Sequence, residues 1–338
     1  MQSIKTFKEN LKQDLENRTS NSLFQVKPAN DWIDEAKKRP IPKMLFGELW
    51  FEGELNILFA DTNLGKSILA VQIANSISAG IPTCGLALEA QQQPVIYLDF
   101  ELSDKQFECR YSDKYDNHFT FNNNFLRAEI QPNSKIPKEY DSFEEFLIKS
   151  IEILVIQHSV KILIIDNISY LKNGTEKATE ATTLMIFLND LKKKYHLSIL
   201  VLAHTPKRDY TKPLSKNDLS GSKSLMNFCD SSFAIGQSFN SSGVRYIKQI
   251  KQRVVEELYG IENVITYSII KNVNFLKFRF EGYDNELNHL KQQTQVDFNT
   301  RNDDILKLKS EGKSNVAIGQ LFNISEGAVR NILKKYNS

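Results

Sequence analysis

The chain has 338 residues, of which 41% are hydrophobic and 25% charged, and these values are ordinary for a globular protein with a sizeable core. Its formal net charge of +2 is too small to indicate nucleic-acid binding by the surface as a whole, so any basic binding site must be local. The three cysteines, Cys84, Cys109 and Cys229, are far apart and form no CxxC pair, which indicates neither a disulfide framework nor a cysteine metal site.

The first residues are expected to form an appendage rather than a domain. Residues 1–39 are polar with scattered apolar positions, which predicts one or two amphipathic helices, and we assign 1–40 to an N-terminal helical or linker segment. Their charged start lacks the apolar core of a signal peptide, and no apolar run is long enough to cross a bilayer. We therefore expect a cytoplasmic protein. Two prolines and two glycines in RPIPKMLFGELWFEGE mark a boundary.

A strand, a turn and a helix start follow one another at Leu55–Ser78, LNILFADTNLGKSILAVQIANSIS. Leu55–Phe59 is a short apolar run that predicts a buried strand, and apolar residues recur at helical spacing over Ser67–Ala79, before Gly80. A loop at a helix N-terminus binds anions, because backbone N–H groups and the helix dipole face the ligand there. We predict a nucleotide-binding phosphate loop formed by Ala60, Asp61, Thr62, Asn63, Leu64, Gly65, Lys66, Ser67 and Ile68.

The loop matches the Walker A pattern with one departure. Gly65 lets the backbone come close to the phosphates, Lys66 can reach the β- and γ-phosphates of ATP, and the Ser67 hydroxyl can ligate Mg²⁺. Ala60 stands where the first glycine is usual, and Asn63 can supply a left-handed conformation that glycine more often gives. The alternative is an ordinary strand–loop–helix that happens to contain GKS. The elements on both sides favour the nucleotide interpretation.

Strands and helices alternate after the loop. Further strands are expected at Val95–Phe100, Phe125–Ile130, Lys161–Asp166 and Ser198–Ala203. Further helices are expected at Ser103–Lys114, Ser142–Gln157 and Glu176–His196. This alternation is typical of an α/β fold, in which helices cover both faces of a mostly parallel sheet.

Two carboxylates are expected at the sheet edge that carries the loop. Asp166 ends the strand of KILIIDN, where an acid can hold Mg²⁺ through water. Glu101 follows the strand of VIYLDF and could polarise a water for attack on the γ-phosphate. Asp99 is a rival in the same segment. Glu101 could also merely begin the following helix, where acids are favoured.

Three further residues are candidates for chemistry. His204 ends the strand of LVLAHTPKR, where it could bond a phosphate or be structural. Lys251 and Arg253 lie two apart in IKQIKQR, which predicts that they share one face of a strand. Two such cations usually mark a solvated surface, but they could also reach the γ-phosphate of a neighbouring subunit.

The chain changes character after Asp230. Four strand-like segments follow and could be further core strands and a hairpin: DSSFAIG, VRYIKQIKQR, NVITYSIIK and NFLKFRFEG. The polar stretch at 284–303, DNELNHLKQQTQVDFNTRND, is expected to be a linker.

Residues 296–338 predict a separate unit of three short helices. Their apolar positions are Ile305, Leu306, Leu308, Val316, Ile318, Leu321, Phe322, Val329, Ile332 and Leu333, and Ser325 is a good N-cap for the third helix. The stretch GKSNVAIGQLFNISEGAVRNILKK resembles the helix-turn-helix of resolvase-type and response-regulator-type DNA-binding domains. Residues 301–338 hold seven Lys and Arg against four Asp and Glu, and we predict DNA contacts from Arg330, Lys334 and Lys335. The alternative is a small bundle that contacts protein.

The order of these segments resembles that of the RecA-like ATPases of the DnaB and RepA hexameric helicase group, over Phe46–Gly282. The segments are FEGELNILFADTNLGKS, VIYLDFELS, KILIIDNISYL, ILVLAHTPKR, DLSGSKSLMNFCDSSFAI and IKQIKQR. The resemblance implies a catalytic Glu101, a sensor histidine as in the RepA branch, and a lysine–x–arginine pair that acts across a subunit interface. It also implies rings, usually of six subunits, with ATP and Mg²⁺ between subunits. The chain departs from the DnaB pattern in having no N-terminal helical domain of that kind.

These observations predict a RecA-like P-loop ATPase domain at 41–295 and a helix-turn-helix DNA-binding domain at 296–338. The expected catalytic residues are Glu101, Lys66, Asp166, His204, Lys251 and Arg253. We expect an oligomeric ATPase that acts on DNA, single-stranded in a central channel or duplex through the helix-turn-helix, in helicase or mobile-element replication or mobilisation work. The alternatives are an ATP-switched DNA-binding regulator and a recombination ATPase that does not unwind DNA.

Overall fold

The computed structural model describes residues 24–131, 135–167, 177–206, 208–219, 222–292, 295–322 and 324–336. The chain divides into two compact units, Met1–Pro42 and Lys43–Ser338. The predicted domain limits at residues 40 and 295 stay predictions. In the first unit, helix α2 (Ala29–Ala36) buries none of its residues and leaves Trp32 and Ile33 exposed. Any helix predicted before residue 24 lies outside the described residues.

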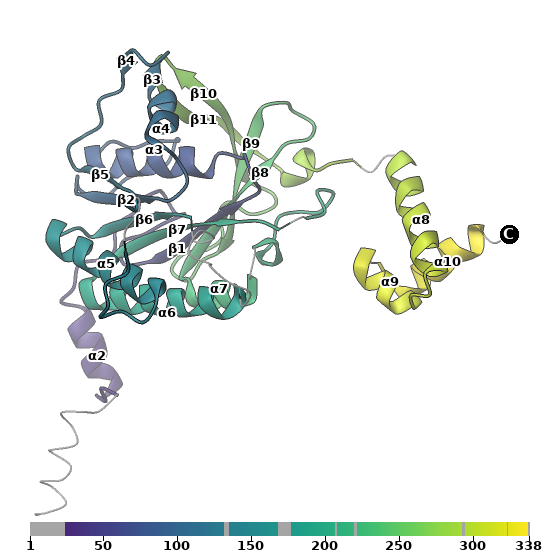
Figure 1. Ribbon diagram of the computed structural model, residues 1–338, viewed down its shortest axis with the longest axis horizontal. Coiled ribbons are helices and arrows are strands. Elements are labelled where there is room, and N and C mark those ends of the chain that lie inside the picture. Colours follow the sequence, from purple (N-terminus) through teal and green to yellow (C-terminus); the bar gives the residue numbers. More distant parts are fainter. Residues whose placement is uncertain are drawn as a thin grey trace, which may run out of the picture. The chain divides into compact units, whose positions relative to one another are not determined.

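A nine-stranded sheet forms the centre of the second unit in the part of the chain that the structure describes (Figure 1). Its strand order is β11-β10-β9-β8-β1-β7-β6-β2-β5. The strands are β1 (Leu55–Ala60), β2 (Val95–Asp99), β5 (Phe125–Ala128), β6 (Ile162–Asp166), β7 (Ser198–His204), β8 (Ser231–Gln237), β9 (Val244–Lys251), β10 (Val264–Asn272) and β11 (Phe275–Asp284). Neighbouring strands pair in parallel through β5, β2, β6, β7, β1 and β8. Strands β9, β10 and β11 then extend the sheet beyond β8 in antiparallel pairs. The predicted α/β class is confirmed.

Helices cover both faces of this sheet, as Figure 1 shows for α3 on one side and α5 and α6 on the other. The helices of this layer are α3 (Lys66–Ala79), α4 (Asp104–Arg110), α5 (Phe143–His158), α6 (Lys177–Tyr195) and α7 (Ser222–Phe228), with short turns η2 (Lys216–Asp218) and η3 (Glu286–His289). Alternate residues of β1 join different cores: Leu58 and Ala60 pack with α3, whereas Ile57 and Phe59 pack with α5 and α6. A parallel strand that is buried on both faces reads as a nearly continuous apolar run, and LNILFA is apolar except for the buried Asn56.

Helix α4 is shorter than predicted. It ends at Arg110 rather than Lys114, and a small hairpin of β3 (Ser112–Asp113) and β4 (Asn117–His118) follows. Tyr111 is buried, with its ring centroid 5.1 Å from that of Phe121. The helix ends where burial of the Tyr111 side chain takes precedence. Such an end cannot be predicted from apolar periodicity, because it depends on contacts with residues outside the helix.

The predicted linker at 284–303 is wrong in its first part. Glu286 and His289 of η3 are buried, and Glu286 accepts hydrogen bonds from Lys248 Nζ at 2.5 Å and from Leu214 N–H at 2.6 Å. A buried ion pair needs polar residues in the sequence, so the stretch resembles a solvated linker although it packs against β9. Its second part begins helix α8 at Gln295.

The C-terminal residues form three helices, α8 (Gln295–Ser310), α9 (Asn315–Phe322) and α10 (Glu326–Tyr336). Their core is made by Ile305, Ile318, Val329 and Leu333. The Ser325 hydroxyl accepts the Ala328 N–H at 3.1 Å, so the predicted N-cap is confirmed.

Two of the apolar residues that mark the second helix lie outside this core. Val316 and Leu321 are 56% and 60% exposed. Val316 lies about 200° round the helix from Ile318, at 100° per residue, and therefore faces away from the core. Whether these helices form a DNA-binding helix-turn-helix stays a prediction. None of the helices in the described part of the chain has the length and apolar character that a membrane span requires.

Candidate functional site

The loop between β1 and α3 has the backbone that the sequence predicts. Asn63 adopts a left-handed φ of 64° and Gly65 one of 94°, and α3 begins at the next residue, Lys66. Residues after Ala60 thus turn sharply into a helix N-terminus. Such a turn directs backbone N–H groups and the positive end of the helix dipole toward an anion.

Gly65 is required by space as well as by backbone angle. A Cβ at Gly65 would lie 2.8 Å from Ile269 Cδ1 and 2.9 Å from Phe278 Cε2. Both contacts are shorter than Cβ atoms tolerate, and both come from the antiparallel edge of the sheet. The loop therefore packs against β10 and β11 at a point where only glycine fits.

Replacing Gly65 with alanine is expected to destabilise the fold more than the same change at Gly53. Gly53 also has positive φ, 76°, but no atom lies within 4 Å of its ideal Cβ. The left-handed backbone costs about 1–2 kcal/mol in both variants, and overpacking adds roughly 1–3 kcal/mol for Gly65→Ala alone. Urea unfolding of the two variants measures this difference. Equal losses of unfolding free energy would show that the loop gives way without cost.

Lys66 lies inside the loop rather than in solvent. Its Nζ donates to the carbonyls of Ala60 at 2.9 Å and Asp61 at 3.0 Å, and lies 3.2 Å from His204 Nδ1. The residue is 6% exposed, and burial lowers the pKa of its ammonium group. Lys66 therefore joins the loop to the end of β7, where the predicted sensor histidine stands.

Asp166 stands beside the helix start, at the end of β6. Its carboxyl group hydrogen-bonds the Ser67 hydroxyl and accepts the Tyr97 hydroxyl at 2.5 Å. Burial raises the pKa of Asp166 to about 6. A hydroxyl and a carboxylate in contact at this position are hard oxygen donors, which is the donor type that Mg²⁺ prefers. The residues present therefore fit the predicted metal site.

Glu101, Asn167 and His204 form a cluster beside Lys66. Asn167 Nδ2 donates to Glu101 Oε1 and lies 3.0 Å from His204 Nε2, which is itself 3.4 Å from Glu101 Oε1. The hydrogen bond with His204 is the main cause that lowers the pKa of Glu101, so this carboxylate is ionised at neutral pH. The parallel register brings these residues together from the ends of three neighbouring strands.

Asp99, the rival of Glu101, is committed elsewhere. Its Oδ1 accepts the N–H groups of Glu101 at 3.1 Å and Leu102 at 2.9 Å, and its Oδ2 accepts Arg127 Nε at 2.9 Å. The carboxylate is buried and holds the turn after β2. Helix α4 begins only at Asp104, so Glu101 is not in a first helical turn either. Both observations favour Glu101 as the carboxylate that serves the loop.

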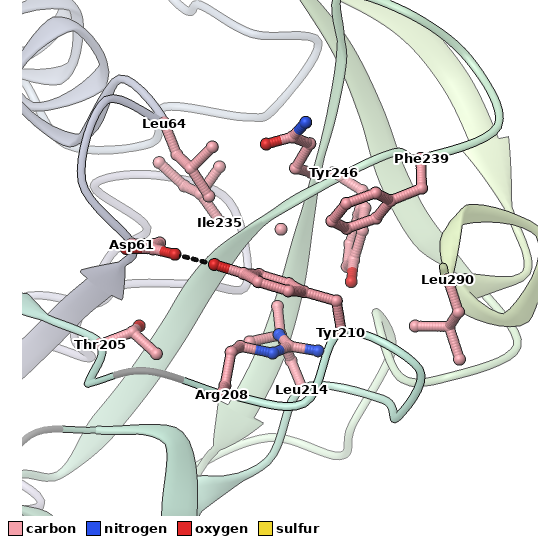
Figure 2. Close-up of a pocket in the computed structure, with 12 residues that line it drawn as sticks. Asp61, Leu64, Thr205, Arg208, Tyr210, Leu214, Ile235, Phe239, Tyr246 and Leu290 are labelled. Atoms are coloured by element: carbon pink, nitrogen blue, oxygen red, sulfur yellow. Dashed lines mark hydrogen bonds between the residues drawn. The ribbon is translucent and has the colours of Figure 1, made fainter. Parts of the chain in front are cut away.

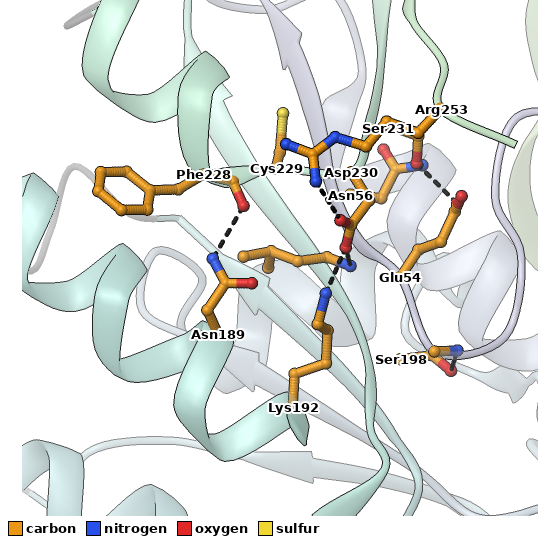
Figure 3. Close-up of polar contacts among 12 residues, drawn as sticks. Glu54, Asn56, Asn189, Lys192, Ser198, Phe228, Cys229, Asp230, Ser231 and Arg253 are labelled. Carbon is orange, nitrogen blue, oxygen red and sulfur yellow. Dashed lines mark hydrogen bonds and ion pairs between the residues drawn. The ribbon is translucent and has the colours of Figure 1, made fainter. Parts of the chain in front are cut away.

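Lys251 and Arg253 lie at the opposite edge of the sheet. Lys251 ends β9 opposite Ser232, and Ser232 pairs with Ile57 near the start of β1, whereas the phosphate loop follows the end of β1. Arg253 lies two residues beyond β9, so the predicted shared strand face is wrong. Lys251 Nζ donates to the carbonyls at the end of α7, and Arg253 contacts Asp230 (Figure 3). The structure does not bring either cation to the loop of its own chain.

A tyrosine that the sequence analysis missed also contacts the loop. The Tyr210 hydroxyl donates to Asp61 Oδ2, and the Tyr210 ring lies 5.1 Å from that of Phe239 in a small pocket (Figure 2). The same pocket is lined by Thr205 and Arg208, which follow His204. No sequence signal singles out Tyr210, because its role depends on how the segment after β7 folds back.

The predicted DNA-contact residues lie on α10. Arg330 is exposed and forms an ion pair with Glu326 at 2.6 Å, one turn earlier on the helix. Lys334 and Lys335 occupy the last turn of the same helix and are also exposed. The three cations therefore lie on one helix near the C-terminus.

Comparison with known proteins assigns the chain to a family. Residues 21–209 match the family model described as AAA domain. The solved KaiC-like protein PH0186 from the hyperthermophilic archaeon Pyrococcus horikoshii OT3 is similar with 14% sequence identity and a TM-score of 0.46, over 68% of this chain and 91% of that chain. No curated protein matches the chain. Because the family model spans more than half of the sequence, including the phosphate loop, Glu101 and Asp166, the chain belongs to the AAA domain family.

Proposed function

We propose that the protein is an oligomeric ATPase that acts on DNA, as a RepA-like helicase or as a replication or mobilisation ATPase of a mobile element. The observation that carries the ATPase part is the convergence of Lys66, Glu101 and Asp166 on one loop at the carboxyl edge of a parallel sheet. Ligands of such sheets bind at that edge.

Each residue of the site has a separate task in hydrolysis. The loop N–H groups beside Gly65 and the Lys66 ammonium bind the β- and γ-phosphates. Ser67 and Asp166 would hold Mg²⁺, which supplies charge neutralisation for the phosphates. Glu101 orients a water and accepts its proton as the water oxygen attacks the γ-phosphorus. The bond from the γ-phosphorus to the β,γ-bridging oxygen breaks, and ADP and phosphate leave. Asn167 and His204 fix the position of the Glu101 carboxylate, and the lowered pKa of Glu101 means that it is ionised before the water binds.

The position of Arg253 supports an assembly of several copies. Arg253 and Lys251 lie at the amino edge of the sheet, whereas the phosphate loop lies at the carboxyl edge. Cations at the opposite edge from their own phosphate loop can serve hydrolysis only if they approach the nucleotide of another copy. We therefore propose a homo-oligomer, with a hexameric ring as the form that the family resemblance suggests.

The C-terminal unit supports the proposal of DNA as a partner. Its three helices have their own apolar core, and α10 carries Arg330, Lys334 and Lys335. A single mildly basic copy has modest DNA affinity, and several copies in one assembly increase it through avidity.

A chain that ends near Val296 is expected to keep its ATPase activity and to lose duplex binding. The reason is that the nucleotide site lies wholly within residues before that point, whereas the cations of α10 lie after it. Fluorescence anisotropy with labelled duplex DNA at two salt concentrations, beside an ATPase assay, measures both properties. Unchanged duplex affinity would remove the helix-turn-helix interpretation.

The second candidate is a DNA-binding regulator in which ATP controls assembly. The three-helix unit favours it, since such a unit can recruit a protein to duplex DNA without a motor.

ATP hydrolysis with and without single-stranded DNA, in the wild type and in Lys66→Ala and Glu101→Gln variants, distinguishes the motor from the regulator. Strong stimulation by DNA that both variants lose supports the motor. Slow hydrolysis that ignores DNA, with nucleotide-dependent assembly, supports the regulator. ATP-dependent DNA binding without unwinding would support a recombination ATPase.

A further inference from the structure

Asp230 holds Arg253 through a carboxylate whose two oxygens have different partners. Its Oδ2 accepts the Leu55 N–H at 2.9 Å and also contacts Lys192 Nζ of α6. Its Oδ1 accepts Arg253 Nη1 at 3.1 Å. Figure 3 shows Lys192 and Arg253 approaching this carboxylate from different elements. One oxygen is therefore anchored on the scaffold, and the other accepts the guanidinium group of Arg253.

The anchor of Asp230 is rigid. Its backbone N–H donates to the Leu55 carbonyl at 2.8 Å, and its side chain accepts the Leu55 N–H in return, so the residue is fixed to the first residue of β1. Strand β1 is buried along its whole length. The side chain of Asp230 is 17% exposed, whereas that of Arg253 is 53% exposed and follows the end of β9. Arg253 Nη2 also donates to the Asn227 carbonyl at 3.4 Å, a longer hydrogen bond to a neutral acceptor, so Asp230 is the charged partner that restricts the rotamers of Arg253.

The surroundings of Asp230 keep an excess of positive charge. Lys192, Lys251 and Arg253 gather around Asp230, with Glu54 as the other nearby carboxylate. Burial raises the pKa of Glu54, and even with both carboxylates ionised the three cations outnumber them. The cluster therefore orients Arg253 without cancelling the positive potential that a phosphate would meet.

We propose that Asp230 is a positioning residue that presents Arg253 to the nucleotide of a neighbouring copy. This inference rests on the proposed function, because it needs Arg253 to act across a subunit interface. Asp230 itself does not touch the nucleotide of either copy. Its carboxylate sets the direction of the guanidinium group before the neighbouring copy arrives, so that less rotamer freedom is lost on forming the complete site.

The test uses mixed oligomers of full-length chains, co-expressed with different tags and purified through both. A Lys66→Ala chain has no working pocket but still donates Arg253, whereas an Arg253→Ala chain keeps its pocket and donates nothing. Their mixture regains hydrolysis at interfaces where the first chain donates to the second. The Asp230→Asn change is then placed either in the donor chain or in the acceptor chain of this mixture. Asn keeps the shape but directs an amide at N–H donors.

The inference predicts an asymmetric result. Asp230→Asn in the donor chain lowers the regained kcat roughly tenfold with an unchanged KM for ATP, the size expected when one charge-assisted hydrogen bond is lost. The same change in the acceptor chain leaves the regained activity within about twofold, and Asp230→Glu in the donor restores part of the loss. Glu152→Gln, which removes an ion-paired carboxylate between α5 and α6, is the matched control and should have no effect in either chain.

Each other outcome overturns the inference in a recognisable way. Equal loss in donor and acceptor chains would mean that Asp230 only supports the fold. No loss in either chain would mean that Arg253 needs no orientation from Asp230. If the starting mixture of Lys66→Ala and Arg253→Ala chains regained no hydrolysis, donation across the interface would itself be wrong, and the proposed assembly would be rejected together with the role of Asp230.

Discussion

Replacing Arg253 with alanine is expected to lower ATP hydrolysis by about three orders of magnitude while nucleotide affinity stays within a few-fold of the wild type. Arg253 lies at the sheet edge opposite the phosphate loop of its own chain, so its removal leaves that loop and its contacts intact. The lost guanidinium group would otherwise stabilise the charge that spreads over the γ-phosphate during transfer. Steady-state hydrolysis and a titration with a fluorescent nucleotide measure the two effects separately.

Arg279→Ala is the matched control for this experiment. Arg279 has a similar exposed fraction, 57% against 53% for Arg253, and it also forms one ion pair with a carboxylate. It lies on β11 and has no assigned role, so hydrolysis should stay near the wild-type rate. An Arg253→Ala protein with full turnover would remove this residue from the site.

Replacing Glu101 with glutamine is expected to lower hydrolysis by about 10²- to 10⁴-fold, the usual contribution of a general base. Gln keeps the size of the side chain and a hydrogen-bond acceptor for Asn167, but it takes no proton from water at neutral pH. Nucleotide binding should therefore persist, and the variant should accumulate in the ATP-bound state. Single-turnover hydrolysis beside equilibrium nucleotide binding measures this separation.

Glu108→Gln provides the comparison for Glu101. Glu108 is an ion-paired acid on α4, close in sequence but directed at Lys105 and His118 rather than at the loop. Its replacement should change hydrolysis by less than about twofold. Near-normal turnover in Glu101→Gln would mean that another residue acts as the general base. Asp99 is poorly placed for that role because its oxygens hold the turn after β2.

The sequence predicted most of the sheet because its strands are buried on both faces. LNILFA, VIYLD and ILIID are apolar apart from Asn56 and the final aspartates, and each is a strand within a residue or two of its expected limits. The parallel order then places the ends of these strands at one edge, which is why Lys66, Glu101 and Asp166 could be proposed together. Local pattern and topology point to the same site.

The remaining features depend on contacts between distant residues. The position of Asn167 directly after Asp166 places it at the same sheet edge. Its contacts with Glu101 and His204, however, depend on the register of three strands. Tyr210 reaches Asp61 across 149 positions in the sequence, and no periodicity signals such a contact. The buried pair of Lys248 and Glu286 looks polar in the sequence and was therefore assigned to a linker.

The proposed function depends above all on binding of a nucleoside triphosphate by the phosphate loop. Isothermal titration calorimetry with a non-hydrolysable ATP analogue and Mg²⁺ tests it directly on the purified full-length chain. We predict saturable binding of one nucleotide per chain, weakened at least about tenfold in Lys66→Ala through the loss of a charged hydrogen-bond donor. A titration with no saturable heat, or with equal affinity in the wild type and Lys66→Ala, would contradict the account.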